Sequence, residues 1–139
     1  MSARTKARKR ALDMLYGADV RDQPIHVILT AEAARAAHEP AREASWLYAR
    51  EIVDGVFDHA AEIDEQLETY AQGWTLARMP VVDRAILRIG VWEMLFNPQV
   101  PVAVAIDEAV EAAKQFSTDD SAGFVNGLLG KIAQANALG

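Results

Sequence analysis

Residues 80–96 read PVVDRAILRIGVWEMLF, and this stretch decides the fold. Pro80 suits the start of a helix because its fixed φ angle is already helical. The residues that follow are apolar around most of the helix circumference, which is typical of a central helix covered by its neighbours. In so short a chain, part of this apolar surface is alternatively left for a partner. The apolar positions are Val82, Ile86, Leu87, Ile89 and Trp92.

Outward from this stretch, widely spaced Pro and Gly residues divide the chain into further helices. Ser2 can cap the first, and Gly73 breaks the fourth. In the second helix, Ile25, Ile28 and Leu29 are expected to turn inward. The stripe predicted for the third is Trp46, Ala49, Val53, Val56 and Phe57. We predict about seven helices: 2–20, 24–38, one opening at Pro40, 61–71, 81–96, 101–116, and a last one capped by Asp119, Asp120 or Ser121.

Two stretches also resemble β-structure. Residues 100–106 are rich in β-branched side chains, and Asn126-Gly127 is a common hairpin turn. We favour helices at both places, because Pro101 fits a helix start, alanines continue the run, and no strand partner lies nearby. The sequence therefore predicts an all-α protein without internal repeats.

Length and composition bound the class of protein. The chain has 139 residues, with 51% hydrophobic and 24% charged residues, which is the balance of a globular protein. It has no cysteine, which excludes disulfides, thiolate metal sites and a cysteine nucleophile. No apolar run reaches the roughly 18 residues of a membrane span, and no signal-peptide core follows the basic N-terminus. We expect a cytoplasmic protein.

The sequence offers no candidate catalytic machinery. The three histidines, at positions 26, 38 and 59, have no second ligand at helical spacing, so no metal site is predicted. The acidic residues between 58 and 68 fit a solvated helix face, and no serine has an adjacent general base. We expect no cofactor and a protein that binds rather than an enzyme.

The strongest anomaly is the charge distribution. Residues 1–10 carry five bases and no acid, a charge of +5, whereas the other nine bases and 20 acids give −11, so that the whole is −6. Cations in the first turns of a helix oppose its macrodipole, so stability does not explain them. A bound phosphate explains them, because helix N–H groups and cationic side chains converge on it. The alternative is a frayed, solvated tail.

Several motifs follow one another in a specific order along nearly the whole chain. They are residues 82–89 (VDRAILRI) followed by Glu93, Val100-Pro101, 105–111 (AIDEAVE) with Ala113-Lys114, 124–127 (FVNG), and arginines followed by Leu15-Tyr16. In these motifs the chain resembles the NusB family of bacterial transcription antitermination factors. The resemblance implies one NusB-like domain over 1–139, built from two helical sub-bundles of about 1–72 and 74–139 with a boundary near Gly73. It also implies binding to boxA of ribosomal RNA leader transcripts together with NusE, a small-subunit ribosomal protein, within an RNA polymerase antitermination complex.

The resemblance also assigns site residues. Three of them have a structural alternative. Tyr16 can stack on an unpaired base or pack in the core, and Phe124 can line the RNA path or belong to the core. Asp120 can likewise be only a helix cap. Asp83 and Leu87 match the contact with NusE and are expected to face outward. The implied RNA-binding residues are Arg4, Lys6, Arg8, Lys9, Arg10, Tyr16, Asp120 and Phe124.

Two rival functions remain from the sequence. Similar helical domains precede the catalytic domain of some ribosomal RNA cytosine methyltransferases, but this chain has neither a cofactor-binding sheet nor a cysteine. The alternative is thus an RNA-binding helical domain of that type without catalytic activity. The second rival is a homodimeric structural protein that does not bind RNA. It requires that the basic N-terminus has no binding function. The sequence leaves monomer and homodimer open, since a homodimer can use the same apolar face as a partner.

Overall fold

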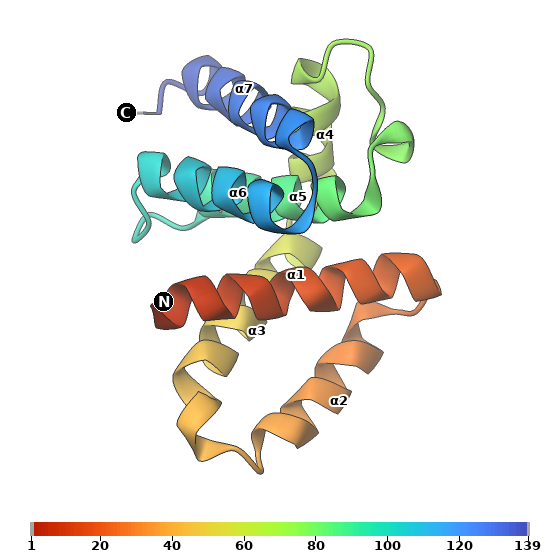
Figure 1. Ribbon diagram of the computed structural model, residues 1–139, viewed down its shortest axis with the longest axis vertical. Coiled ribbons are helices and arrows are strands. Elements are labelled where there is room, and N and C mark those ends of the chain that lie inside the picture. The colour runs from red at the N-terminus through yellow and green to blue at the C-terminus, as the bar shows by residue number, and fades with distance from the viewer. Residues whose placement is uncertain (1, 139) are drawn as a thin grey trace. The chain divides into compact units, whose positions relative to one another are not determined.

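The computed structural model describes residues 2–138, and in this range every regular element is a helix and no strand is found (Figure 1). The all-α prediction is confirmed. Residues 102–106 and Asn126-Gly127 both lie inside α-helices. The elements are α1 (Ala3–Arg21), α2 (Ile25–Ala36), the 3-10 turn η1 (Pro40–Arg42), α3 (Glu43–Asp58), α4 (Ala60–Tyr70), the 3-10 turn η2 (Leu76–Arg78), α5 (Val81–Phe96), α6 (Val102–Phe116) and α7 (Asp119–Ala135).

The chain forms two compact units, the first ending at Asp54 and the second beginning at Gly55, within α3. The boundary expected near Gly73 is not found there. The reason is that α4 packs against α5 and α7 and so belongs with them. Gly73, at φ +89°, turns the chain between α4 and η2 inside the second unit.

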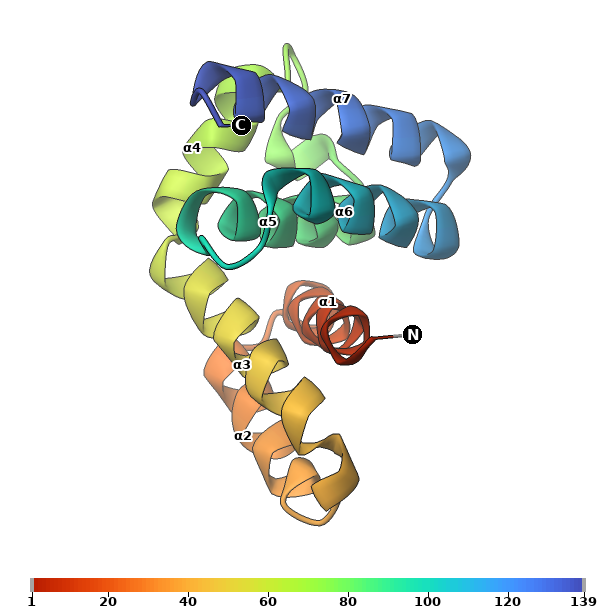
Figure 2. The ribbon, with the colours of Figure 1, turned by 90° about the vertical axis from the view of Figure 1, so that its left-hand side faces the viewer.

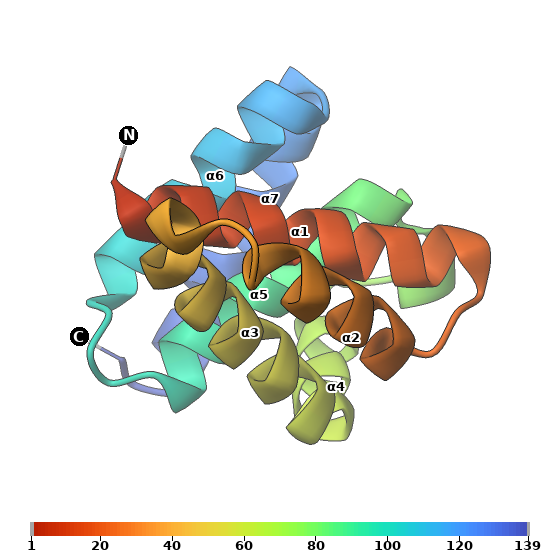
Figure 3. The same ribbon diagram turned by 90° about the horizontal axis from the view of Figure 1, so that it is seen from below.

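The first unit contains α1, α2 and the greater part of α3. The side chain of Ser2 caps α1 by accepting the Thr5 N–H at 3.1 Å, as predicted. Figures 1 and 3 show α2 and α3 as the arms of a hairpin closed by η1, and Figure 2 shows α1 end-on beside it. The α2 side chains expected to turn inward, Ile25, Ile28 and Leu29, are only half-buried.

The second unit is built around α5, which contacts α4, α6 and α7. Its side chains are buried around most of its circumference, as the apolar pattern predicts. Gly55, in the last turn of α3, packs against Trp92 of α5. A Cβ added there would lie 1.9 Å from Nε1 of Trp92, so only glycine permits this approach.

Two local predictions are wrong. The cap of α7 is Thr118, whose extended backbone lets its hydroxyl accept the Ser121 N–H at 3.0 Å, so Asp119 and Asp120 lie in the first turn instead. Phe57 is 65% exposed, although it was assigned to the apolar stripe of α3. The buried face of α3 is displaced toward Tyr48 and Ile52, which leaves Phe57 at its outer edge.

Neither a membrane span nor a metal-binding cluster is found in the part of the chain that the structure describes. None of its helices is long and apolar enough to cross a bilayer. Within the same residues, no three His, Asp or Glu side chains gather in a group that could hold a metal ion.

Candidate nucleic-acid interface

The basic residues of α1 form two groups around the helix. Arg4 and Arg8 are one turn apart and therefore share a face. Lys6 and Arg10 share another face for the same reason, and Lys9 lies between the two. Arg4 and Lys6 are exposed and Arg8 is half-buried. The first turn contains no acid. The helix N-terminus therefore combines the positive end of its dipole with exposed cations, which favours an anion.

Arg4 and Arg8 lie over one aromatic ring. Their guanidinium carbons are 5.0 Å and 5.9 Å from the centroid of Tyr48, a buried residue of α3 in the same unit. Both distances fall within the range in which a cation is attracted to the negative face of a ring. The two side chains are thus held on one side of α1.

The other cations of α1 differ in their surroundings. Lys9 Nζ donates to both carboxylate oxygens of Asp13, at 2.6 Å and 2.8 Å, one turn further along. Arg10 is half-buried, and one of its terminal nitrogens, Nη1, is enclosed without a hydrogen-bond partner. Lys6 remains exposed. The predicted basic cluster is therefore an ordered pair, Arg4 and Arg8, accompanied by three cations with separate environments.

Tyr16 lies under two helical turns beyond Arg10 on α1. Its side chain is 41% exposed, so it is not a core residue. Of the two interpretations left open by the sequence, the geometry excludes a ring enclosed in the bundle. An exposed aromatic ring on a helix with several cations is suited to stacking on a base.

In the second unit, Asp120 and Phe124 lie one turn apart on α7. Asp120 is exposed and Phe124 is half-buried. The Phe124 ring contacts Trp74, with centroids 6.3 Å apart and planes inclined by 59°. Trp74 is 53% exposed, so the pair forms a partly accessible aromatic surface. The sequence prediction missed Trp74, because it lies in a connection rather than on an amphipathic helix.

The structure does not present Asp83 and Leu87 outward. Asp83 is only 3% exposed, and its Oδ2 accepts a hydrogen bond of 2.7 Å from Ser121 Oγ of α7. Its other oxygen, Oδ1, is buried without a partner. Leu87 is fully buried. Both residues lie on a helix that is buried around most of its circumference, which leaves them no free face for a partner.

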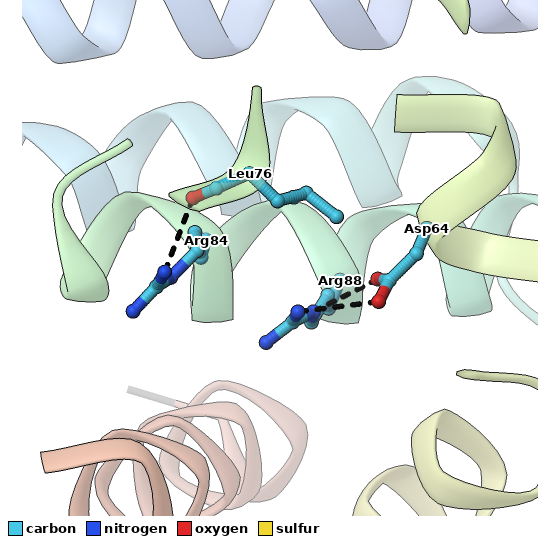
Figure 4. A network of polar contacts seen from close by, with 4 residues as sticks. All are labelled: Asp64, Leu76, Arg84 and Arg88. Atoms are coloured by element: carbon cyan, nitrogen blue, oxygen red, sulfur yellow. Dashed lines mark hydrogen bonds and ion pairs between the residues drawn. The ribbon is translucent and has the colours of Figure 1, made fainter. Parts of the chain in front are cut away.

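Two arginines of α5 form a further polar network, in which they project from the same side of the helix (Figure 4). Arg88 donates to both carboxylate oxygens of Asp64 in α4, at 3.0 Å and 3.3 Å. Arg84 donates to the carbonyl of Leu76 in η2, at 3.1 Å. These bonds connect α5 to α4 and to η2, so both arginines contribute to the packing of the second unit.

Comparison with known proteins agrees with this architecture. The NusB family model matches residues 5–134. The chain belongs to the NusB family. The transcription antitermination protein NusB of Leifsonia xyli subsp. xyli is 78% identical over 134 residues, which cover 96% of this chain and 93% of that protein.

Solved NusB structures have the same fold. T. maritima NusB is 32% identical with a TM-score of 0.81, covering 96% of this chain and 92% of that one. A crystal structure of antitermination factors NusB and NusE in complex with dsRNA contains a chain that is 28% identical with a TM-score of 0.83, covering 97% of this chain and 98% of that one. The NusB family match includes most of α1 and nearly all of α7, the two helices that carry the candidate residues.

Proposed function

We propose that this protein binds the boxA element of ribosomal RNA leader transcripts through the N-terminal half of α1, together with a NusE partner. The observation that carries the proposal is the arginine pair on α1, Arg4 and Arg8, held on one face of a helix N-terminus in an otherwise acidic chain. As a NusB family member, it would then join RNA polymerase and oppose premature termination. This function implies a cytoplasmic location.

The chemistry of the site favours RNA over other anions. Two guanidinium groups and the positive end of a helix recognise phosphate, whereas an exposed tyrosine recognises an unpaired base. Arg4 and Arg8 supply the first and Tyr16 supplies the second, and all three lie on α1. Asp120 and Phe124 of α7 are proposed as additional contacts of the same RNA, with Lys6, Lys9 and Arg10 adding charge.

The comparisons support the choice of ligand and partner. A chain with the same fold was crystallised as NusB with NusE and dsRNA. Because base stacking requires unpaired bases, we propose that this protein prefers a single strand to a duplex. We propose a binding role without a catalytic step for the whole chain.

Mobility shift with a short boxA RNA tests the proposal, with and without NusE, and with the same sequence as a duplex. We expect the single strand to bind more tightly than the duplex, and NusE to increase the affinity. The variant Arg4→Ala/Arg8→Ala should bind at least tenfold more weakly, since each phosphate contact of a charged group contributes about 1 kcal/mol or more.

Arg35→Ala/Arg42→Ala is the matched control. It removes the same charge from two arginines whose carboxylate partners are Glu32 and Glu39. This control should bind almost as the parent protein does. Equal losses in the two double variants would indicate a general charge effect and would remove α1 from the interface.

A further inference from the structure

We propose that Tyr48 is a positioning residue for RNA binding: its ring holds Arg4 and Arg8 together as a preassembled phosphate clamp. The inference rests on the proposed function and goes beyond it, since Tyr48 is not expected to touch RNA. It is a buried residue on a different helix from the one that carries the cations.

The geometry starts from helical spacing. Arg4 and Arg8 are four residues apart on α1, so their side chains leave the helix on the same face. Tyr48 lies in the second turn of α3. The centroid of its ring is 5.0 Å from the guanidinium carbon of Arg4 and 5.9 Å from that of Arg8. One buried ring thus serves as a common support for two cations.

The arrangement of the two cations has an electrostatic cost. Two like charges one turn apart repel each other, and the positive end of a helix opposes both. The negative face of an aromatic ring offsets part of this repulsion. Because Tyr48 is buried, its ring is fixed by packing and cannot follow the arginines if they move away. The ring therefore selects the conformers in which both guanidinium groups face the same region.

A cation–π contact and a phosphate contact use different parts of a guanidinium group. A cation–π contact uses the face of a guanidinium group, whereas the five N–H donors lie in its plane. A hydrogen-bonded carboxylate in the place of Tyr48 would occupy these donors and neutralise the charge. The contact with the Tyr48 ring therefore orients the group without using the in-plane donors that recognise phosphate oxygens.

The expected benefit is preorganisation. An arginine loses much rotamer freedom when it is immobilised by a ligand, and this loss weakens binding. Arg4 and Arg8 already lose part of that freedom in the free protein through Tyr48. Removal of the ring should therefore lower RNA affinity, although the number of phosphate contacts in the complex remains the same.

Three variants at position 48 test this inference. Tyr48→Leu keeps an apolar side chain but removes the ring, and Tyr48→Phe keeps the ring. Pentafluorophenylalanine, incorporated at the same position, keeps the shape of Phe but removes the negative ring face. We expect near-parental RNA affinity for Tyr48→Phe and a loss of roughly three- to tenfold for the other two, the size expected for one or two cation–π contacts.

Two further readouts separate positioning from stability. In NMR spectra, the side-chain Cδ protons of Arg4 and Arg8 should be shifted upfield by the Tyr48 ring in the free protein, and Tyr48→Leu should abolish the shift. The slope of log affinity against log salt should remain parental in Tyr48→Leu, since no phosphate contact is lost, whereas it should become shallower in Arg4→Ala/Arg8→Ala. All titrations are made well below each variant's melting temperature.

The outcomes distinguish the two proposals. If Arg4→Ala/Arg8→Ala binds as tightly as the parent protein, the proposed function of α1 is wrong. If that variant loses affinity but Tyr48→Leu and the fluorinated variant do not, the positioning role of Tyr48 is overturned. The absence of the upfield shift in the parent protein overturns it as well, even if Tyr48→Leu does not fold.

Discussion

At the scale of single residues, two tyrosines of the first unit have opposite environments. Tyr48 is buried beneath two arginines, whereas Tyr16 is 41% exposed. Exposure of a large ring to water is unfavourable by the hydrophobic effect, so a ring that stays accessible is suited to a ligand. The difference makes Tyr16 a candidate for contact with a base and Tyr48 a support for the cations.

We predict that Tyr16→Ala loses about 1–3 kcal/mol of RNA binding free energy, the usual contribution of stacking on one base. Its melting temperature should change little, because removing an exposed ring leaves no large cavity. Tyr16→Phe should retain most of the affinity. Thermal melts measure the stability of both variants, and RNA titrations measure their affinity. A large loss of stability with intact RNA binding by the folded protein would contradict the stacking role.

A second residue-scale prediction concerns two glycines. Gly55→Ala should lower the free energy of unfolding by about 1–3 kcal/mol, the usual cost of overpacking, since its Cβ would lie 1.9 Å from Trp92 Nε1. Gly130→Ala is the control: no atom lies within 4 Å of its Cβ position in α7. It should stabilise the protein by about 0.5–1 kcal/mol, because alanine favours helix. Urea denaturation measures both, and equal effects would contradict the close packing at Gly55.

At the scale of helices, the sequence predicted those helix ends and breaks that depend only on residues adjacent in the chain. Proline and glycine positions predicted the ends of α5 and the break at Gly73, since their backbone restrictions are local. The cap of α7 was missed, because Thr118, Asp119, Asp120 and Ser121 are all acceptable caps and the backbone angle at Thr118 decides between them.

The site was only partly predictable for the same reason. The cations of α1 are consecutive in sequence, and their charge was evident without a structure. The contact with Tyr48 joins residues about forty positions apart, and no periodicity reveals such a pair. Asp83 was expected to face outward because the family resemblance matches it to the contact with NusE, yet a hydroxyl of α7 provides the hydrogen bond that permits its burial.

This hydrogen bond leads to a prediction about α5 and α7. Ser121→Ala removes the donor to Asp83 Oδ2, and Oδ1 already lacks a partner. A buried carboxylate would then be unsatisfied, so the free energy of unfolding should fall by about 1–3 kcal/mol.

Ser117→Ala is the matched control for that change, since its hydroxyl donates to Ser121 Oγ at 3.0 Å and not to the carboxylate. It should lose at most about 1 kcal/mol. Chemical denaturation measures the free energy of unfolding of both variants. Similar losses would mean that the hydrogen bond to Asp83 makes no contribution of its own to stability. Asp83→Lys should unfold the second unit rather than report on a surface contact, because it buries an unpaired cation.

At the scale of the whole molecule, the distribution of charge is the property that matters for RNA. A net charge of −6 repels a polyanion, while five bases within the first ten residues attract it. At physiological salt, screening acts over about 8 Å, so an acid farther than this from the bound strand weakens binding less than a base in contact with the strand strengthens it. Binding should therefore be local to α1 and strongly dependent on ionic strength.

The last prediction makes this quantitative. For single strands, log affinity falls with log salt by about 0.7 for each neutralised phosphate, so three or four contacts give a slope of roughly −2 to −3. Arg4→Ala/Arg8→Ala should make the slope shallower by about 1.4, because two contacts are lost. Glu51→Gln/Glu68→Gln, which neutralises two exposed acids, should raise the affinity slightly and leave the slope unchanged. Titrations at four salt concentrations measure all three slopes. If the slope of the parent protein is flat, or if the glutamine variant changes it as much as the arginine variant does, the RNA contact is not made by the cations of α1.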